Sequence, residues 1–215
     1  DHDHDHLHQY DPGHQHPVQE DHDDTMTYYR VMEEAVRDLL IEKNFINAEQ
    51  IRDQIEKMDA RVSANGAKVV ARAWIDKAYK KRLVSDPKSA INELGHDIGP
   101  MNLIVLENTE SIHNVVVCTL CSCYPRWILG LPPDWYKSRE YRSRVVREPR
   151  AVLEEFGTMI NDSREVRVHD STADMRYLVL PLQPNGTENY TEAQLVNMIG
   201  RDALIGVVEV AAPSR

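Results

Sequence analysis

Three cysteines, all within six residues, limit how this chain can be stabilised. They occupy positions 118, 121 and 123. An odd number of thiols so close together cannot link distant segments as a disulfide framework does. The fold must therefore rest on a hydrophobic core. A chain of 215 residues, 41% of them hydrophobic, is long enough for one domain with an additional arm.

Charge is distributed unevenly along the sequence. Residues 1–24 alternate Asp and His, and they hold eight of the 35 acidic residues and none of the 25 basic ones. We expect this segment to form a disordered tail, because it has almost nothing to bury; its seven histidines could also capture divalent metal loosely. The rest of the chain carries 27 acids against 25 bases, so we expect no nucleic-acid partner.

Hydrophobic runs are short throughout the sequence. None approaches the roughly 20 residues that a membrane-spanning helix needs. The N-terminal residues also lack the apolar stretch of a signal peptide. We therefore expect a soluble, cytoplasmic chain without a membrane partner.

Hydrophobic periodicity predicts helices and strands that do not alternate regularly. That pattern favours an α+β fold over a doubly wound parallel sheet. We expect an N-terminal arm of two amphipathic helices laid on a partner, followed by a layered α/β/β/α-type domain that carries the cysteines. The predicted helices span 28–43, a segment after an Asn47 cap, 66–84 with Pro87 closing it, 134–147, 149–156 and a short segment after a capping box at Thr191. The predicted strands span 101–107, 113–118, 165–169, 175–180 and 203–210.

The cysteine segment has the donors of a metal claw. Thiolates are soft ligands, and three of them this close can converge on one ion. The amide nitrogens of Ser122 and Cys123 lie between the sulfurs of Cys121 and Cys123, so successive chelate rings would fill a plane with two sulfurs and two nitrogens. Cys118 can supply an axial ligand, which leaves one position for water or substrate, as in catalytic metal sites. Deprotonated amides require a strongly Lewis-acidic ion, so trivalent cobalt or iron fits better than zinc.

Other kinds of cysteine site remain open. A structural zinc site needs a fourth ligand, for which His113 is a candidate. An iron–sulfur cluster usually takes four cysteines, and a redox dithiol would leave Cys123 without a role. A non-catalytic cobalt-storage protein could use the claw together with the histidine-rich tail.

The segment Cys118-Thr119-Leu120-Cys121-Ser122-Cys123 resembles the claw motif of the nitrile hydratase α subunit and of the related thiocyanate hydrolase γ subunit. Thr119 and Tyr124 are the residues typical of cobalt-type sites, whereas iron-type members usually carry Ser and Thr there. The resemblance spans about residues 66–208 and is carried by 66–74, 129–137, 141–150, 176–181, 184–187 and 202–206.

The resemblance implies an enzyme that hydrates a nitrile to its amide at a non-corrin Co(III), with Fe(III) as the less favoured ion. Cys121 and Cys123 would be the catalytic residues, oxidised to a sulfinic and a sulfenic acid. The implied partners are a β subunit whose arginines hold those oxygens, in a heterodimer or heterotetramer, and an activator or cobalt chaperone. The expected domains are a tail at 1–24, a partner-contacting arm at 25–64 and a metal-binding catalytic domain at 65–215. The implied metal ligands are Cys118, Cys121, Ser122 and Cys123.

Two stretches depart from the hydratase pattern. Many cobalt-type hydratases carry Trp after the Tyr-Pro pair, whereas this chain has Arg126 followed by Trp127. Arginine there is familiar from the thiocyanate hydrolase γ subunit, where an additional cation could hold an anionic substrate. Residues 95–102 lack the glutamine of the hydratase Gln-Gly-Glu stretch, so a role for that glutamine cannot be transferred. The alternative function is therefore conversion of thiocyanate to carbonyl sulfide and ammonia.

Individual side chains are expected to have one of three roles: contact with the metal site, packing, or solvent exposure. Thr119, Tyr124 and Arg126 are candidates for contacts with the metal ligands or the substrate, and Arg126 is the one obvious cation beside the claw. Trp74 and Trp135 are expected to pack in the core or an interface. A solvated helix face is expected for Arg142, Arg144 and Arg147.

Overall fold

The computed structural model describes residues 27–121 and 123–211, and the predicted tail at 1–24 lies outside them. The chain divides into two units, residues 1–51 and 52–215. In the first unit, α1 (Tyr28–Glu42) begins after Thr27, whose side chain accepts a hydrogen bond from the backbone N–H of Arg30. None of its residues is buried. This confirms the first predicted helix and leaves its apolar stripe exposed.

The second predicted helix, α2 (Ala48–Asp59), begins at the predicted cap. The side chain of Asn47 accepts from the backbone N–H of Gln50 at 2.8 Å, and the side chain of Gln50 accepts from the backbone N–H of Asn47 at 2.9 Å. Such a reciprocal pair satisfies two of the donors that a helix start leaves open. The helix runs from residues of the first unit into the second.

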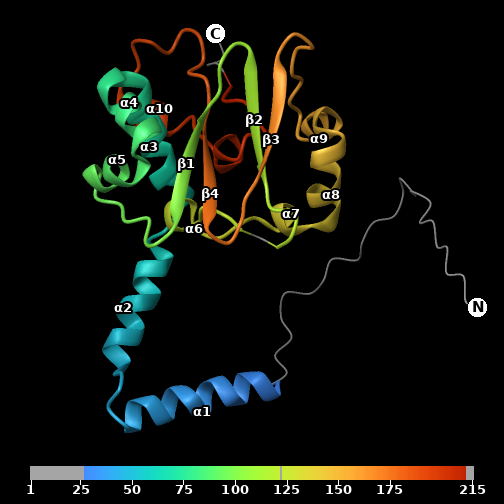
Figure 1. Cartoon of the computed structure of the whole chain (residues 1–215). Coiled ribbons are helices and arrows are strands. Elements are labelled where there is room, and N and C mark those ends of the chain that lie inside the picture. The colour runs from blue at the N-terminus through green and yellow to red at the C-terminus, as the bar shows by residue number, and fades with distance from the viewer. Residues whose placement is uncertain (1–26, 122, 212–215) are drawn as a thin grey trace, which may run out of the picture. The chain divides into compact units, whose positions relative to one another are not determined.

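The second unit is built around two pairs of parallel strands. β1 (Asn102–Glu107) pairs with β4 (Met175–Leu180), and β2 (Ile112–Val117) pairs with β3 (Glu165–Asp170). Figure 1 shows the strands between two groups of helices, with α3 to α5 on the side of β1 and α8 and α9 on the side of β3. This confirms the layered α+β fold. The helices are α3 (Ser63–Ile75), α4 (Lys77–Ser85), α5 (Pro87–Glu93), α6 (Arg126–Leu129), α7 (Asp134–Lys137), α8 (Arg139–Arg147), α9 (Pro149–Glu155) and α10 (Glu192–Val196).

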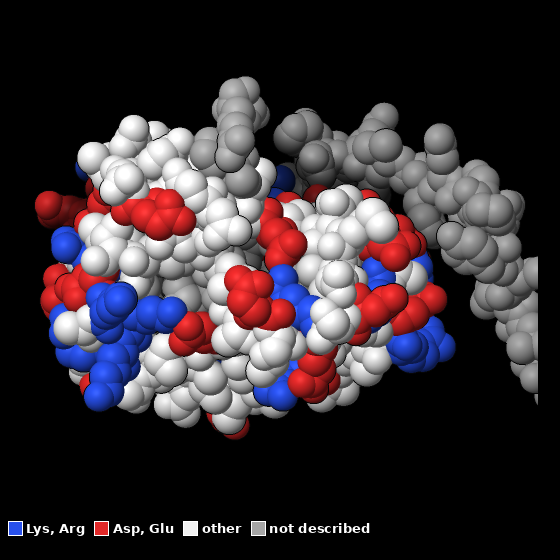
Figure 2. Space-filling view, turned by 90° about the horizontal axis from the view of Figure 1, so that it is seen from above, with Lys and Arg blue, Asp and Glu red and all other residues white. Residues whose placement is uncertain are grey.

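The core lies between the strands and these helices. Residues 115–117 of β2 are fully buried, as are the last three residues of β4. Nearly continuous apolar runs are typical of parallel strands that are covered on both faces. The face in Figure 2 mixes acidic and basic side chains, which agrees with the near balance of charge outside the tail. Among the described residues, no helix has both the length and the apolarity to cross a membrane.

Two predicted helices are each divided by a capping residue. The helix predicted for 66–84 breaks at Asp76, whose extended backbone ends α3 and whose carboxylate accepts the N–H groups of Ala78 and Tyr79 at the start of α4. The helix predicted for 134–147 breaks at Ser138, which caps α8 through the backbone N–H of Tyr141. In addition, Pro87 begins α5, a helix that the sequence analysis did not predict.

The strand predicted for 203–210 is wrong. Residues 201–204 form a 3-10 helix, and the chain then turns at Gly206, whose φ is +86°. The carbonyl oxygen of Asp202 accepts from Gly206 at 3.0 Å and from Val207 at 3.1 Å. One backbone hydrogen bond, from Val116 to Ile205, connects this turn to β2. The apolar run is thus a buried turn, because its backbone groups bond within the run rather than along a ladder.

Candidate metal centre

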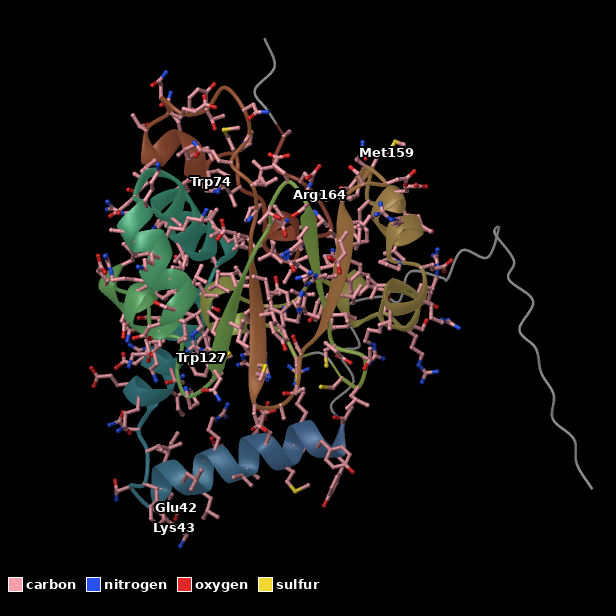
Figure 3. The ribbon with its side chains drawn as sticks, turned by 45° about the horizontal axis from the view of Figure 1, so that its top comes forward. Glu42, Lys43, Trp74, Trp127, Met159 and Arg164 are labelled. Atoms are coloured by element: carbon pink, nitrogen blue, oxygen red, sulfur yellow. The ribbon has the colours of Figure 1, made fainter. Side chains whose placement is uncertain are left out.

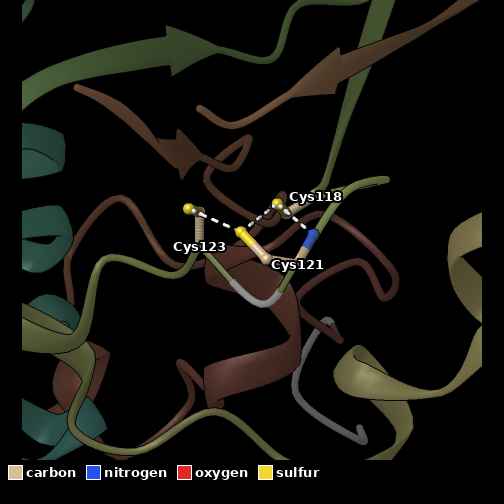
Figure 4. A group of neighbouring side chains, drawn as sticks. All are labelled: Cys118, Cys121 and Cys123. Carbon is tan, nitrogen blue, oxygen red and sulfur yellow. Dashed lines mark hydrogen bonds between the residues drawn. The ribbon is translucent and has the colours of Figure 1, made fainter. Parts of the chain in front are cut away.

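The claw begins where β2 ends. Cys118 follows Val117 directly and is 1% exposed, whereas Cys121 lies at the surface. The Sγ of Cys121 lies 3.3 Å from that of Cys118 and 3.1 Å from that of Cys123 (Figure 4). All three sulfurs lie within 4.8 Å of one another. The structure therefore brings the three predicted thiol ligands together at a site that is buried on one side and open on the other.

Among the described residues, the cluster lacks the fourth ligand that a structural zinc site needs. Within the described residues, this cluster contains the three thiols and neither a histidine nor a carboxylate. The candidate fourth zinc ligand, His113, is buried elsewhere: its Nε2 donates to the carbonyl oxygen of Gly206 at 2.7 Å. Its Nδ1 lies 3.4 Å from the side-chain nitrogen of Asn108. Ser122 lies outside the described residues, so its amide remains a predicted ligand.

Side chains from three other elements hold the claw backbone. The carboxylate of Asp170, at the end of β3, accepts both the backbone N–H and the hydroxyl of Thr119, at 2.9 and 2.5 Å. The guanidinium of Arg142 in α8 donates to the carbonyl oxygen of Cys121 at 3.1 Å. The hydroxyl of Tyr136 in α7 donates to the carbonyl oxygen of Cys123 at 2.8 Å. Arg142, expected on a solvated helix face, thus contacts the claw instead.

Burial and neighbouring thiols disfavour the ionised form of Cys123. Burial and, to a smaller extent, the neighbouring thiols of Cys121 and Cys118 together raise the pKa of the Cys123 thiol to about 12. The charge of Arg176 on β4 opposes this rise in pKa. A metal ion bound through Cys123 would displace the proton of that thiol, so binding would release acid.

A hollow of about 370 Å³ lies beside Tyr124, the first residue after the claw. The Tyr124 hydroxyl is buried and has no hydrogen-bond partner among the described residues. Arg126, exposed in α6, and Arg176, half-buried in β4, line the same hollow. The remaining lining residues are Pro100, Met101, Asn102, Trp127, Ala173 and Asp174. Two arginines thus share this hollow with Asp174.

The tryptophans pack rather than serve as ligands. Trp127 lies beside Gly99, just ahead of β1 (Figure 3), and the guanidinium of Arg61 stacks 3.7 Å from its ring centroid. The indole N–H of Trp74 donates to the carbonyl oxygen of Pro181 at 2.9 Å. The ring of Trp135 makes edge contacts with Tyr136, Tyr141 and Phe156.

Known proteins share both the sequence and the fold. The family described as nitrile hydratase, alpha chain, matches residues 27–208, most of the chain. The chain belongs to this family. A low-molecular-weight cobalt-containing nitrile hydratase subunit alpha from Rhodococcus rhodochrous is 48% identical over 84% of this chain and 88% of its own length. The thiocyanate hydrolase subunit gamma of Thiobacillus thioparus is 42% identical over 83% of this chain and 79% of its own.

Solved structures of the nitrile hydratase family carry more than one kind of metal centre. A double mutant of the Fe-type nitrile hydratase from Comamonas testosteroni Ni1 matches with a TM-score of 0.76 and 42% identity, over 88% of this chain and 97% of that one. A recombinant thiocyanate hydrolase with partially modified cobalt centers matches with a TM-score of 0.77 and 38% identity, over 89% and 97%. The resemblance stated from the claw motif is therefore confirmed at the level of the family, and it includes enzymes of both activities.

Sequence reasoning missed four side chains around the claw: Tyr136, Arg142, Asp170 and Arg176. They lie on α7, α8, β3 and β4, outside residues 118–123. The available signal was that Asp170 follows a predicted strand. Because parallel strands end at the same edge of a sheet, its side chain could have been expected at the same edge as the claw, although not specifically next to β2.

Proposed function

We propose that this chain is the metal-carrying α subunit of a nitrile hydratase with a cobalt centre in the claw. The convergence of three thiols within 4.8 Å, on a segment whose amides can also bind a metal, carries the proposal. Cobalt-containing relatives support the choice of metal over the iron of the Fe-type neighbour. The proposed ligands are the sulfurs of Cys118, Cys121 and Cys123 and the amide nitrogens of Ser122 and Cys123.

The proposed reaction adds one water across the carbon–nitrogen triple bond of a nitrile and gives an amide. Bound trivalent cobalt would supply the Lewis acidity that polarises the nitrile. Cys121 would act as a sulfinic acid and Cys123 as a sulfenic acid. The oxygen that adds to the nitrile carbon comes either from the sulfenic acid of Cys123 or from an activated water. The hollow beside Tyr124 would admit the substrate.

A partner subunit completes the proposal. Oxidised cysteine oxygens carry negative charge, and buried charge needs charged donors. In this chain the Arg142 guanidinium contacts the Cys121 carbonyl oxygen, and further arginines would come from a β subunit in a heterodimer or heterotetramer. Exposed apolar side chains on α1, among them Val36 and Leu39, support a partner-contacting arm at 25–64. An activator that delivers cobalt, a catalytic domain at 65–215 and a cytoplasmic location also remain proposals.

Thiocyanate hydrolysis is the second candidate, and Arg126 favours it. Its exposed side chain lines the hollow together with Arg176, so the hollow offers two cations to an anionic substrate. A neutral nitrile has no comparable need for such charge. The γ subunit from Thiobacillus thioparus matches this chain nearly as closely as the hydratase relatives do.

The two candidates can be separated by their products. The chain would be purified with its partner subunit, loaded with cobalt, and given a simple nitrile and thiocyanate in parallel. Amide without carbonyl sulfide supports the hydratase, whereas carbonyl sulfide without amide would sink it. The variant Arg126→Trp should leave amide formation in place in a hydratase, but it should raise the KM for thiocyanate in a thiocyanate hydrolase. Cobalt uptake without either product would leave a storage protein.

A further inference from the structure

Sheet register places one carboxylate against the start of the claw. β2 and β3 are parallel, and Val117 at the end of β2 is paired with Asp170 at the end of β3. The backbone N–H of Ser171 then donates to the carbonyl oxygen of Val117 at 2.7 Å, so the two strands stay together as they end. The Asp170 side chain therefore emerges beside Cys118, the first residue of the claw.

Both oxygens of this carboxylate bind one residue of the claw. Oδ1 of Asp170 accepts the backbone N–H of Thr119 at 2.9 Å, and Oδ2 accepts the Thr119 hydroxyl at 2.5 Å. Hydrogen bonds to an ionised acceptor are shorter and stronger than neutral ones. The peptide between Cys118 and Thr119 is thereby held through its N–H.

We infer that Asp170 is a positioning residue for the metal claw and acts through Thr119. The inference rests on the proposed function. With the Thr119 peptide held, the loop returns so that the backbone N–H of Cys121 points at the Cys118 sulfur, 3.3 Å away. The Cys118 sulfur therefore lies close to the sulfurs of Cys121 and Cys123 before metal arrives.

The same contact also distinguishes the backbone amides of the loop by what they bind. The N–H of Thr119 is engaged by a carboxylate and stays a donor, whereas the amides of residues 122 and 123 are those proposed to bind the metal. Supporting groups of this kind orient metal ligands, and removing them typically lowers metal affinity or activity about 10–100-fold. Thr119 and Asp170 are both exposed, so their contact contributes little to the stability of the core.

The test compares cobalt retention among variants of the full chain produced with its partner subunit. Cobalt per chain, its rate of loss to a chelator, and the visible absorption of the cobalt–thiolate centre would be measured for each variant. Asp170→Ala should increase cobalt loss about 10–100-fold and shift the absorption. Asp170→Asn should lose less, because its amide can accept from one Thr119 donor and donate to the hydroxyl oxygen. The rate of cobalt loss from Thr119→Val should lie between those of the wild type and Asp170→Ala. Thr119→Ser should lose cobalt more slowly than Thr119→Val.

Two further variants decide whether the effect passes through Thr119. The double variant Thr119→Val/Asp170→Ala should be no worse than Asp170→Ala alone, because both changes remove one interaction. Glu165→Ala is the matched control: an exposed acid of the same strand that pairs with Arg167 at 2.8 Å. Each of three results would overturn the inference. These are additive effects on cobalt loss in the double variant, cobalt loss from Glu165→Ala as fast as from Asp170→Ala, and cobalt retention in Asp170→Ala equal to that of the wild type. If the wild-type chain itself takes up no cobalt, the proposed function fails and this inference fails with it.

Discussion

Two clusters of hydrogen-bonding and metal-binding side chains lie along β2, and they differ in what they bind. Near its start, the side-chain oxygen of Asn108 accepts two hydrogen bonds from Asn114, at 2.8 Å from the backbone N–H and 3.0 Å from the side chain. His113, fully buried between them in the sequence, donates to Gly206. At the end of β2, the thiols of residues 118–123 face one another instead. The first cluster is satisfied by hydrogen bonds within the chain, whereas the second gathers like donors that suit a shared cation.

This difference separates structural from chemical roles. Buried polar groups that find partners inside the chain stabilise one fold, and losing a partner leaves an unsatisfied group that costs stability. Thiols that converge on a common point contribute little to the fold until a metal joins them. We therefore expect changes in the first cluster to alter the free energy of unfolding, and changes in the claw to alter metal binding.

The largest effect is expected in the claw. Cys123→Ser replaces a soft ligand with a hydroxyl, so cobalt uptake and product formation should fall by more than the roughly 100-fold typical of merely supporting residues. The thermal unfolding midpoint of the metal-free chain should stay within a few degrees, because Cys123 is only partly buried. Metal analysis and a thermal melt measure the two quantities. A variant that keeps its cobalt would remove Cys123 from the ligand set.

The next largest effect is expected on stability, from a change at Gly206, which lies against the hydrogen-bonded cluster of Asn108, His113 and Asn114. Its φ is +86°, and an added Cβ would collide with the carbonyl oxygen of Asn114. Gly206→Ala should therefore combine strain in the left-handed region, ~1–2 kcal/mol, with overpacking of ~1–3 kcal/mol. Gly186→Ala is a matched control, because Gly186 has a φ of +85° but open space around its Cβ position. Urea unfolding of both variants measures the difference, and equal losses would mean that the close approach to Asn114 has no energetic role.

Local signals in the sequence predicted most elements of the fold. The apolar runs of β2 and β4 and the caps at Asn47 and Thr191 are read within a few residues, and the structure confirms them. The breaks at Asp76 and Ser138 were missed, because a capping side chain inside an amphipathic pattern resembles an ordinary helical residue. Gly206 was a signal against the strand predicted for 203–210, since glycine inside a strand pattern often marks a bend.

Pairing and the surroundings of the claw could not be predicted in the same way. Cysteine spacing predicted which thiols converge, because all three lie on one short segment. Asp170, Arg142 and Arg176 reach the site from β3, α8 and β4, and their approach depends on strand pairing and helix packing. Local periodicity carries no information on which distant strand is a neighbour or on its register.

A smaller effect is expected from the buried histidine. Burial lowers the pKa of His113 below its usual 6.5, and the charges of Arg164 and Arg150 lower it further, against the hydrogen bond to Gly206 and the charge of Glu209. The neutral ring is thus favoured in the folded state, so its contribution to stability is present above pH 6.5 and is lost as the pH falls through the lowered pKa. The loss should approach ~1.4 kcal/mol per pH unit at most.

Urea unfolding at several pH values between 7.5 and 5 would measure this loss. His113→Gln keeps a donor for the carbonyl oxygen of Gly206 but cannot titrate, so its stability should fall less steeply with pH. Some acid sensitivity should remain, because burial also lowers the pKa of His169. Identical slopes in wild type and His113→Gln would show that His113 does not titrate in this range.

The smallest effect is expected at Arg142 of α8, and Arg147 of the same helix is its control. The comparison tests whether Arg142 supports the claw. Arg142 donates to the carbonyl oxygen of Cys121 at 3.1 Å, whereas Arg147 donates to Ser143 within its own helix at 3.1 Å. A partly exposed hydrogen bond of this kind contributes ~0.5–1 kcal/mol, which corresponds to about a two- to fivefold faster loss of cobalt in Arg142→Gln. Arg147→Gln should leave the rate of cobalt loss unchanged, because the Arg147 guanidinium donates within its own helix. If both variants lose cobalt at the same rate, the helix acts through its overall charge, and Arg142 belongs to the solvated face rather than to the claw.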